Sequence, residues 1–299
     1  MTSRRHTAQL RATLLALAVV AATGCATPRR APLLEGQRTR LDNVKTVASF
    51  ARPELGVSIE VSKIETYFPG AGMPSLIDAP INAHRTRVAE NAAAPIRQAI
   101  VDHDAGSALR AALEKELGSL PWLEGNVVEL KKVTDTREGI AQAVQESGAN
   151  YLLLVQVDHR FTPAFDAIVI TARVSVLEKA TARPLYLNTI LTARRHPGLP
   201  AGKTPLELAA RLWTDANGVG ARHALDDGMA ELAAMIAFDL TEAKDTGGNL
   251  YDARGNPRAE SVPNAYGADM EGYVVREPNG RIWVRFKNGD LSAFEALAR

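Results

Sequence analysis

The chain has 299 residues, with 35 Lys and Arg and 34 Asp and Glu, so its formal net charge at pH 7 is +1. Three of the arginines and none of the acids fall in the first 24 residues, and without them the net charge is about −2. This balance excludes a global attraction to nucleic acid. A single cysteine, Cys25, excludes an internal disulfide, so packing and hydrogen bonds must stabilise the core.

The first 24 residues have the pattern of a secretory signal peptide. Three arginines precede an apolar run at residues 12–22, in which Thr13 is the only polar residue. The run is much shorter than the roughly 20 apolar residues that a helix needs to cross a bilayer. We therefore predict that residues 1–24 direct export and are then removed.

The cysteine stands at the end of this segment. The residues Ala22-Thr23-Gly24-Cys25 resemble the lipobox of bacterial lipoproteins. That resemblance implies cleavage before Cys25 and attachment of a diacylglycerol and a further acyl chain, such as palmitate, to this residue. Each buried methylene adds about 0.8 kcal/mol, so two or three chains give a firm anchor. The alternative is a plain signal peptide with an incidental cysteine.

The residue after the cysteine bears on the membrane that would hold the anchor. In enterobacterial lipoproteins an aspartate at this position favours retention in the inner membrane, whereas this chain has Ala26. By that resemblance we expect the periplasmic face of the outer membrane of a Gram-negative cell. Residues 25–45 contain prolines and arginines without a clear period, and we predict a lipidated tether there. Its arginines could contact anionic headgroups, or the tether could be a solvated spacer.

Residues 46–240 are predicted to form one α/β (α+β) periplasmic domain, a mixed sheet with helices packed on it. Alternation and apolar runs predict strands, and apolar residues at helical spacing predict helices. Pro95 is expected to kink or break its helix. The expected strands are 57–68, 126–133, 151–157 and a hairpin whose turn is 178–184 and whose second strand is 185–194, and the expected helices lie within 85–101, 102–122, 134–150, 206–218 and 221–240.

Two stretches of this domain resemble a known group. A helix ending in Glu146-Ser147-Gly148 runs into Ala149-Asn150-Tyr151-Leu152-Leu153-Leu154-Val155, and the hairpin 176–186 has Ala182 where the group usually has glycine. These patterns resemble periplasmic lipoproteins of the TolB-amino-terminal-like group, which includes curli-secretion lipoproteins and penicillin-binding-protein activators. The resemblance covers roughly residues 50–240 and implies an α/β fold in the periplasm.

The carboxyl-terminal part is predicted to be a small β-meander at residues 269–299, joined by a linker or long loop at 241–268. Asn279-Gly280 lies between two strand-like runs and is typical of a type I′ hairpin turn. The aromatic residues here are either the core of the meander or a partner surface. If Ile282, Val284 and Phe286 face inward, alternation turns Arg281, Trp283 and Arg285 outward as a candidate protein contact.

Candidate catalytic groups are few. Asp102-His103-Asp104 could bind a metal or act in hydrolysis, but adjacent helix side chains point apart, and Asp104 also suits a helix cap. Asp158-His159 follows a strand end, where clefts often form. The stretch 198–204 is one residue too short for a phosphate loop. No G-x-S-x-G motif is present, so we expect no enzymatic activity, no cofactor and no metal.

Three hypotheses of function follow. The first is an anchored, non-catalytic adaptor of an envelope assembly, which predicts an exposed apolar patch and a protein partner. The second is an auxiliary lipid- or small-molecule-binding lipoprotein of an envelope transporter, which predicts an apolar pocket between sheet and helices. The third is a hydrolase, which predicts that Asp102, His103 and His159 converge in one cleft.

Overall fold

We describe residues 30–60, 74–200, 204–242, 260–263, 269–286 and 288–295 of a computed structural model. The predicted signal peptide, the lipobox and the first residues of the tether lie outside this part of the chain. Within the described part, no helix combines the length and apolarity needed to cross a membrane.

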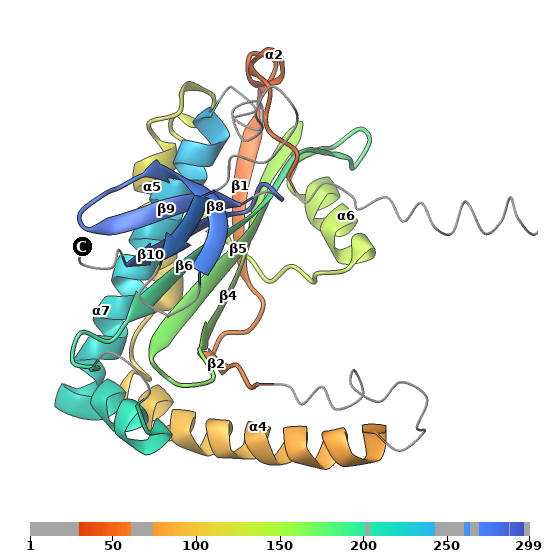
Figure 1. Ribbon diagram of the computed structural model, residues 1–299. Helices are drawn as coiled ribbons and strands as arrows, with labels where there is room; N and C mark the ends of the chain where they lie inside the picture. Colours follow the sequence, from red (N-terminus) through yellow and green to blue (C-terminus); the bar gives the residue numbers. More distant parts are fainter. Residues whose placement is uncertain are drawn as a thin grey trace, which may run out of the picture.

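The centre of the molecule is a mixed sheet (Figure 1). Its strands lie in the order β3-β1-β4-β5-β6-β10-β9-β8-β7, and a short β2 also pairs with β4. β1 runs parallel to β3 and β4, whereas β4, β5 and β6 form antiparallel pairs. The strands are β1 (Val44–Phe50), β2 (Gly56–Val57), β3 (Val128–Leu130), β4 (Tyr151–Phe161), β5 (Ala167–Glu178), β6 (Pro184–Arg195), β7 (Glu260–Pro263), β8 (Asp269–Arg276), β9 (Arg281–Phe286) and β10 (Leu291–Glu295).

Helices pack on both faces of the sheet, and the predicted α/β class, a mixed sheet with helices packed on it, is confirmed. The helices are α2 (Glu35–Arg38), α4 (Pro74–Ala99), α5 (Ala105–Leu117), α6 (Arg137–Glu146) and α7 (Leu206–Thr241), with a 3₁₀ turn at Pro121–Leu123. α4, α5 and α7 share the main core with one face, and α6 packs on the other. Figure 1 shows α2 and the carboxyl end of α7 at one end of the sheet and α4 at the opposite end.

The apolar run at the start of β4 explains this layering. Successive side chains of a strand point to opposite faces. Leu153 and Val155 therefore join the core with α4, α5 and α7, whereas Leu152 and Leu154 join the smaller core with α6. A strand covered on both faces needs apolar residues at every position, and this strand is correctly predicted.

The amino-terminal boundary of the domain differs from the prediction. Residues 30–45 do not form a solvated tether, because Arg30 and Leu33 are buried and Ala31 pairs with Leu187 of β6. β1 begins at Val44. Polar residues interrupt its apolar pattern, so the sequence did not predict this strand. Ser49 is buried within this strand, and its hydroxyl accepts a hydrogen bond from the backbone N–H of Val133 at 2.9 Å.

Other element boundaries also shift. Of the strand predicted at 57–68, only Val57 lies in β2, and residues 61–73 are outside the described part. Pro95 does not break its helix, because α4 is continuous through it. The two helices predicted around residue 220 are confirmed as two arms of α7, which bends at residues 215–218. Gly218 has φ +77°, and a Cβ there would approach Ile100 to 2.8 Å.

The carboxyl-terminal strands continue the main sheet rather than forming a sheet of their own. β10 pairs in parallel with β6, with Leu291 opposite Ile190. β7 (Glu260–Pro263) lies inside the range predicted as a linker, and residues 243–259 and 264–268 are outside the described part. The meander therefore shares one hydrogen-bonded sheet with the domain before it.

The hairpin turn between β5 and β6 gives a first test of the structure. Ala182 has φ +53°, a left-handed conformation that costs an L-residue about 1–2 kcal/mol and glycine little. Ala182→Gly should therefore raise the free energy of unfolding by about 0.5–1 kcal/mol, measured by urea denaturation. Ala180→Gly in the same exposed turn is the control, and equal stabilities of the two variants would contradict this backbone conformation.

Candidate functional site

We predicted that Arg281, Trp283 and Arg285 face outward as a partner surface, and this prediction is wrong. The three residues are only 7%, 2% and 1% exposed. β9 lies between β8 and β10, and this face of it packs against α7, where the ring of Trp283 meets Phe238 at 5.6 Å between centroids. The opposite face is also buried, through Ile282, Val284 and Phe294.

Glu231 of α7 is the partner of Arg281 and Trp283. Nε and Nη2 of Arg281 each donate to its carboxylate at 2.7 Å, and Trp283 Nε1 donates at 3.2 Å. Thr192 also donates to this carboxylate, and Arg194 lies 3.3 Å from it. Burial raises the pKa of Glu231, but the hydrogen bond and charge of Arg281 outweigh it and hold the pKa below its usual range.

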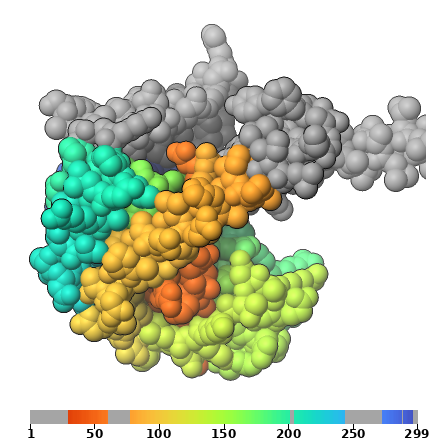
Figure 2. Space-filling model, turned by 90° about the horizontal axis from the view of Figure 1, so that it is seen from below, coloured from red at the N-terminus to blue at the C-terminus, as the bar shows by residue number. Residues whose placement is uncertain are grey.

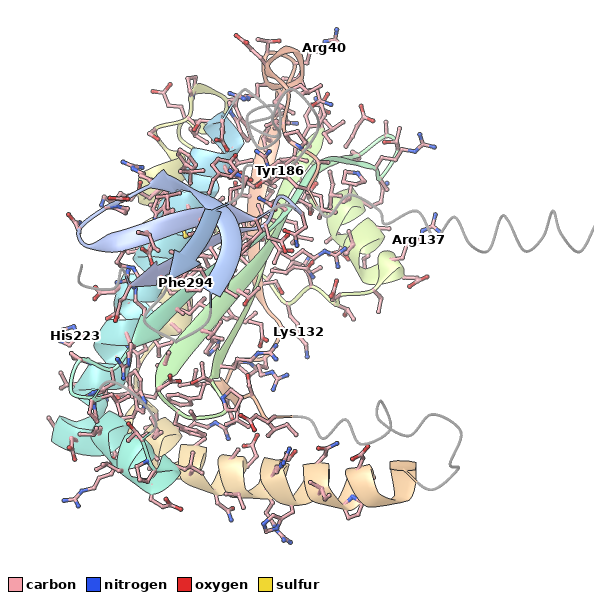
Figure 3. The ribbon with its side chains drawn as sticks, in the orientation of Figure 1. Arg40, Lys132, Arg137, Tyr186, His223 and Phe294 are labelled. Carbon is pink, nitrogen blue, oxygen red and sulfur yellow. The ribbon has the colours of Figure 1, made fainter. Side chains whose placement is uncertain are left out.

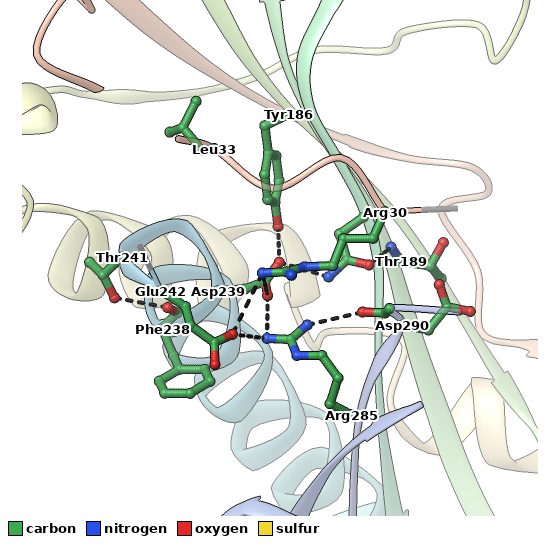
Figure 4. Close-up of polar contacts among 12 residues, drawn as sticks. Arg30, Leu33, Tyr186, Thr189, Phe238, Asp239, Thr241, Glu242, Arg285 and Asp290 are labelled. Carbon is green, nitrogen blue, oxygen red and sulfur yellow. Dashed lines mark hydrogen bonds and ion pairs between the residues drawn. The ribbon is translucent and has the colours of Figure 1, made fainter. Parts of the chain in front are cut away.

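A second buried charge cluster ties three parts of the chain together (Figure 4). Asp239 of α7 lies 2.5 Å from Nη2 of Arg285 and accepts a hydrogen bond from Arg30 at 3.2 Å. Tyr186 and Asn188 of β6 donate to its other oxygen at 2.5 and 2.7 Å. Burial and the charge of Asp239 raise the pKa of Tyr186, which stays protonated. These contacts stabilise the fold. They pair the charged groups with one another, so the groups are not available to bind a partner.

Two adjoining hollows form the best candidate for a binding site. The helix hollow, of about 440 Å³, opens between β4 and the helices α4, α5 and α7. The basic hollow, of about 540 Å³, opens between β1, the residues around β3 and the start of α5. Both are lined by Pro53, His103 and Ala105. Figure 2 shows the red-orange segment around residue 50 recessed between α4 and the yellow-green part of the chain.

The helix hollow is lined by apolar and polar side chains in similar measure. Leu55, Ala94, Ile100, Val101 and Leu225 contribute the apolar surface. The remaining lining residues are Pro53, Glu54, Arg97, Gln98, His103, Ala105 and His159. Nη1 of Arg97 donates to Glu90 at 2.6 Å and its Nε to the carbonyl of Leu55, so this cation is already paired.

His159 is the most buried titratable group of the helix hollow. It is 2% exposed, and its Nδ1 has no hydrogen-bond partner within the described residues. Burial, followed by the charges of Arg52 and His103, lowers its pKa to about 4. The imidazole is therefore neutral at pH 7, and its ring meets Phe50 edge-on at 5.3 Å.

The residues expected in a hydrolase are only partly brought together. His103 and His159 line the same hollow, but Asp102 is not among its lining residues and pairs with Arg222 at 2.6 Å. Asp104 caps α5 by accepting from the backbone N–H and the hydroxyl of Ser107 at 3.0 and 2.6 Å. None of the described residues that line the two hollows is Ser, Thr or Cys.

Two further candidate sites carry no ligand chemistry. In the stretch expected to resemble a phosphate loop, the backbone N–H of Gly198 donates to His196 at 3.0 Å, and residues 201–203 are outside the described part. Across the described residues, no group of three or more His, Cys, Asp and Glu side chains is placed to hold a metal ion.

Comparison with known proteins gives weak likenesses only. No protein-family profile and no curated protein sequence matches the chain. A PelC variant dodecamer from Paraburkholderia phytofirmans is 13% identical, with 67% of this chain and 91% of that chain covered and a TM-score of 0.27. The hypothetical protein CT253 from Chlamydia trachomatis is 12% identical, with 66% and 98% covered and a TM-score of 0.26. Protein XCC0632 from Xanthomonas campestris, described as DUF330, is 15% identical, with 66% and 85% covered and a TM-score of 0.24. TM-scores this low carry no argument about function.

Proposed function

We propose that this chain is a non-catalytic lipoprotein of the bacterial envelope, anchored through Cys25, that binds a small molecule in the helix hollow. The observation that carries the proposal is a hollow of about 440 Å³ between sheet and helices, lined by both apolar and polar side chains. Ligand sites typically have a volume of roughly 300–1,000 Å³. It is the feature expected of an auxiliary ligand-binding lipoprotein, the second of the three hypotheses.

The chemistry of the hollow supports binding rather than catalysis. None of its described lining residues supplies a hydroxyl or thiol nucleophile that His103, whose Nε2 lies 3.3 Å from Asp226, could activate. The other imidazole, His159, is buried against Phe50 and has a pKa of about 4, well below the value near 7 that suits a general base.

The proposed anchor would hold one particular end of the domain near the membrane. Arg30 is five residues beyond Cys25, so the two residues are at most about 18 Å apart. Ala31 pairs with Leu187, whose row in the sheet contains Ser175 and Leu154. His159 lies five residues further along β4, roughly 17 Å at the rise of a strand, so the helix hollow is displaced from the anchored end.

Removing the thiol tests the anchor. Cys25→Ser should move the protein from the membrane fraction to the soluble periplasmic fraction, because each acyl methylene adds about 0.8 kcal/mol of membrane affinity. Fractionation of cells measures this change of location, and the intact mass of the purified chain measures the loss of the acyl chains. Thr27→Ser is the matched control and should stay acylated. A wild-type chain found unacylated in the soluble fraction would contradict the anchor.

Obstruction of the hollow tests the binding function. Ala94 is an exposed residue of α4 that lines the helix hollow, and Ala83 is an exposed residue of the same helix that does not. Full-length chain carrying Cys25→Ser is purified from its host and extracted with organic solvent, and the extract is identified by mass spectrometry. We expect a stoichiometric small molecule that Ala94→Trp removes and Ala83→Trp retains. A molecule retained equally by both variants, or none in the parent, would overturn the proposal.

Contact with an envelope protein stays a separate prediction. The buried Arg281, Trp283 and Arg285 do not supply its surface. In-cell crosslinking of the anchored chain, compared with the Cys25→Ser chain, would identify a partner at another surface.

A further inference from the structure

The charge of the basic hollow identifies the class of ligand. Three fixed cations line it, Arg52, Lys131 and Lys132, together with His103. Among the described residues that line it, Asp104 is the only carboxylate, and both of its oxygens already accept hydrogen bonds from Ser107. A group entering this hollow therefore meets mainly positive charge.

The carboxylates outside the hollow hold these cations only loosely. Arg52 lies 3.5 Å from Asp158, and Lys131 pairs with Glu146 at an exposed position. Exposed ion pairs of this kind are worth about 0–1 kcal/mol, so a ligand's anion can compete for the cations. Lys132 is exposed and forms no ion pair with any residue in the described part of the chain.

The amino-terminal end of a helix also borders the basic hollow. α5 spans 13 residues and begins at Ala105, and both Ala105 and Gly106 line the basic hollow. The first backbone N–H groups of a helix carry a partial positive charge that favours anions. Asp104 caps this end, because its carboxylate accepts from the backbone N–H of Ser107 at 3.0 Å, so the positive charge of the hollow comes from its side chains.

The two hollows together have the chemistry of a divided site. The apolar walls of the helix hollow, which include Leu55, Ile100 and Leu225, adjoin the cations through the shared residues Pro53, His103 and Ala105. We propose that the ligand is an amphiphile with an anionic headgroup, a carboxylate or a phosphate, whose apolar part occupies the helix hollow while the headgroup lies in the basic hollow. This inference rests on the proposed function of ligand binding.

A pair of fluorescent probes that differ only in charge tests the inference. Dansyl-undecanoate and its uncharged primary amide are titrated into the full-length Cys25→Ser chain at physiological salt. We expect the carboxylate to bind about tenfold more tightly, the equivalent of about 1.4 kcal/mol. The double variant Arg52→Gln with Lys132→Gln should remove that advantage and leave amide binding unchanged.

Matched control variants distinguish an effect of the charges that line the basic hollow from an effect of the protein's net charge. Arg137 and Arg183 are exposed arginines outside both hollows, and Arg137 projects from α6, away from Lys132 (Figure 3). Arg137→Gln with Arg183→Gln should change neither affinity. Displacement of the bound carboxylate probe by laurate and by lysophosphatidate then distinguishes the two headgroups, since the stronger competitor carries the preferred one.

The outcomes separate this inference from the function on which it rests. Equal affinities of the two probes, both lost in Ala94→Trp and retained in Ala83→Trp, would overturn the anionic headgroup and leave ligand binding in place. No binding of either probe, or binding that Ala94→Trp does not weaken, would overturn the inference and count against the proposed function as well. A charge preference that the Arg137 and Arg183 variants abolish equally would also overturn the inference.

Discussion

Asp239→Ala should lower the free energy of unfolding by about 3–5 kcal/mol, because it leaves buried cations without their counter-charge. Asp239 is 1% exposed and lies 2.5 Å from Nη2 of Arg285, which is itself 1% exposed. The same carboxylate accepts from Arg30, Tyr186 and Asn188. Glu242 also pairs with Arg285 but remains partly exposed, so it offsets only part of the loss. Urea denaturation at pH 7 measures the change.

The control for this prediction is Asp227→Ala, which removes an exposed carboxylate from the same helix. Substitutions at such surface positions usually change stability by no more than about 0.5 kcal/mol. If Asp239→Ala were no more destabilising than Asp227→Ala, the buried cluster that joins the amino-terminal segment, α7 and the carboxyl-terminal strands would be wrong.

Glu231→Gln should destabilise the protein by about 3–5 kcal/mol at pH 7, because Arg281 is buried and loses the charge of its bidentate partner. The effect should shrink in acid. The pKa of Glu231 is lower in the folded protein than its usual 4.5, so its ionised form stabilises the fold above that value. As the pH falls through the folded pKa, this contribution is lost, and wild type and variant should converge.

Urea denaturation at pH 7 and at pH 3 measures this convergence. Glu124→Gln, at an exposed position beside the 3₁₀ turn, is the control and should have little effect at either pH. A difference between wild type and Glu231→Gln that grows on acidification would contradict the ion pair, since protonation of Glu231 should make the two chains alike.

The elements predicted most accurately are those with one dominant local signal. The start of β4 has an unbroken apolar run, and the β5–β6 hairpin has regular alternation around a turn, so burial on one or both faces could be predicted directly. β1 was missed because Thr46 and Ser49 are buried polar residues. Ser49 is satisfied by Val133, 84 positions away, and no local pattern contains that contact.

The candidate site could also be predicted only where local sequence patterns determine it, and not where contacts between distant residues do. Alternation correctly placed Arg281, Trp283 and Arg285 on one face of their strand, but it could not show that α7 covers this face. Glu231, the partner of Arg281 and Trp283, is 50 residues away from Arg281. His103 and His159 were both singled out from the sequence, and their common hollow depends on the packing of α4, α5 and α7 against β4.

The buried clusters and the two hollows lie at different positions along the sheet and have different roles. Arg30 and Asp239 form a buried ion pair at the end that the proposed anchor would hold. The hollows lie further along the sheet, where exposed Arg52 and Lys132 can contact a ligand. Substitutions in the clusters should therefore affect stability, and substitutions in the hollows should affect binding with little loss of stability.

The central claim is that the hollows beside His103 form the ligand site, and photo-crosslinking with a diazirine-bearing fatty acid tests it most directly. The probe is bound to the full-length Cys25→Ser chain, illuminated, and the labelled peptides are identified by mass spectrometry. We predict saturable labelling on the peptides that carry residues 50–55, 94–105 and 130–132, the walls of the two hollows. Saturable labelling confined to α2 or to the strands after residue 260, or labelling that does not saturate, would contradict the account.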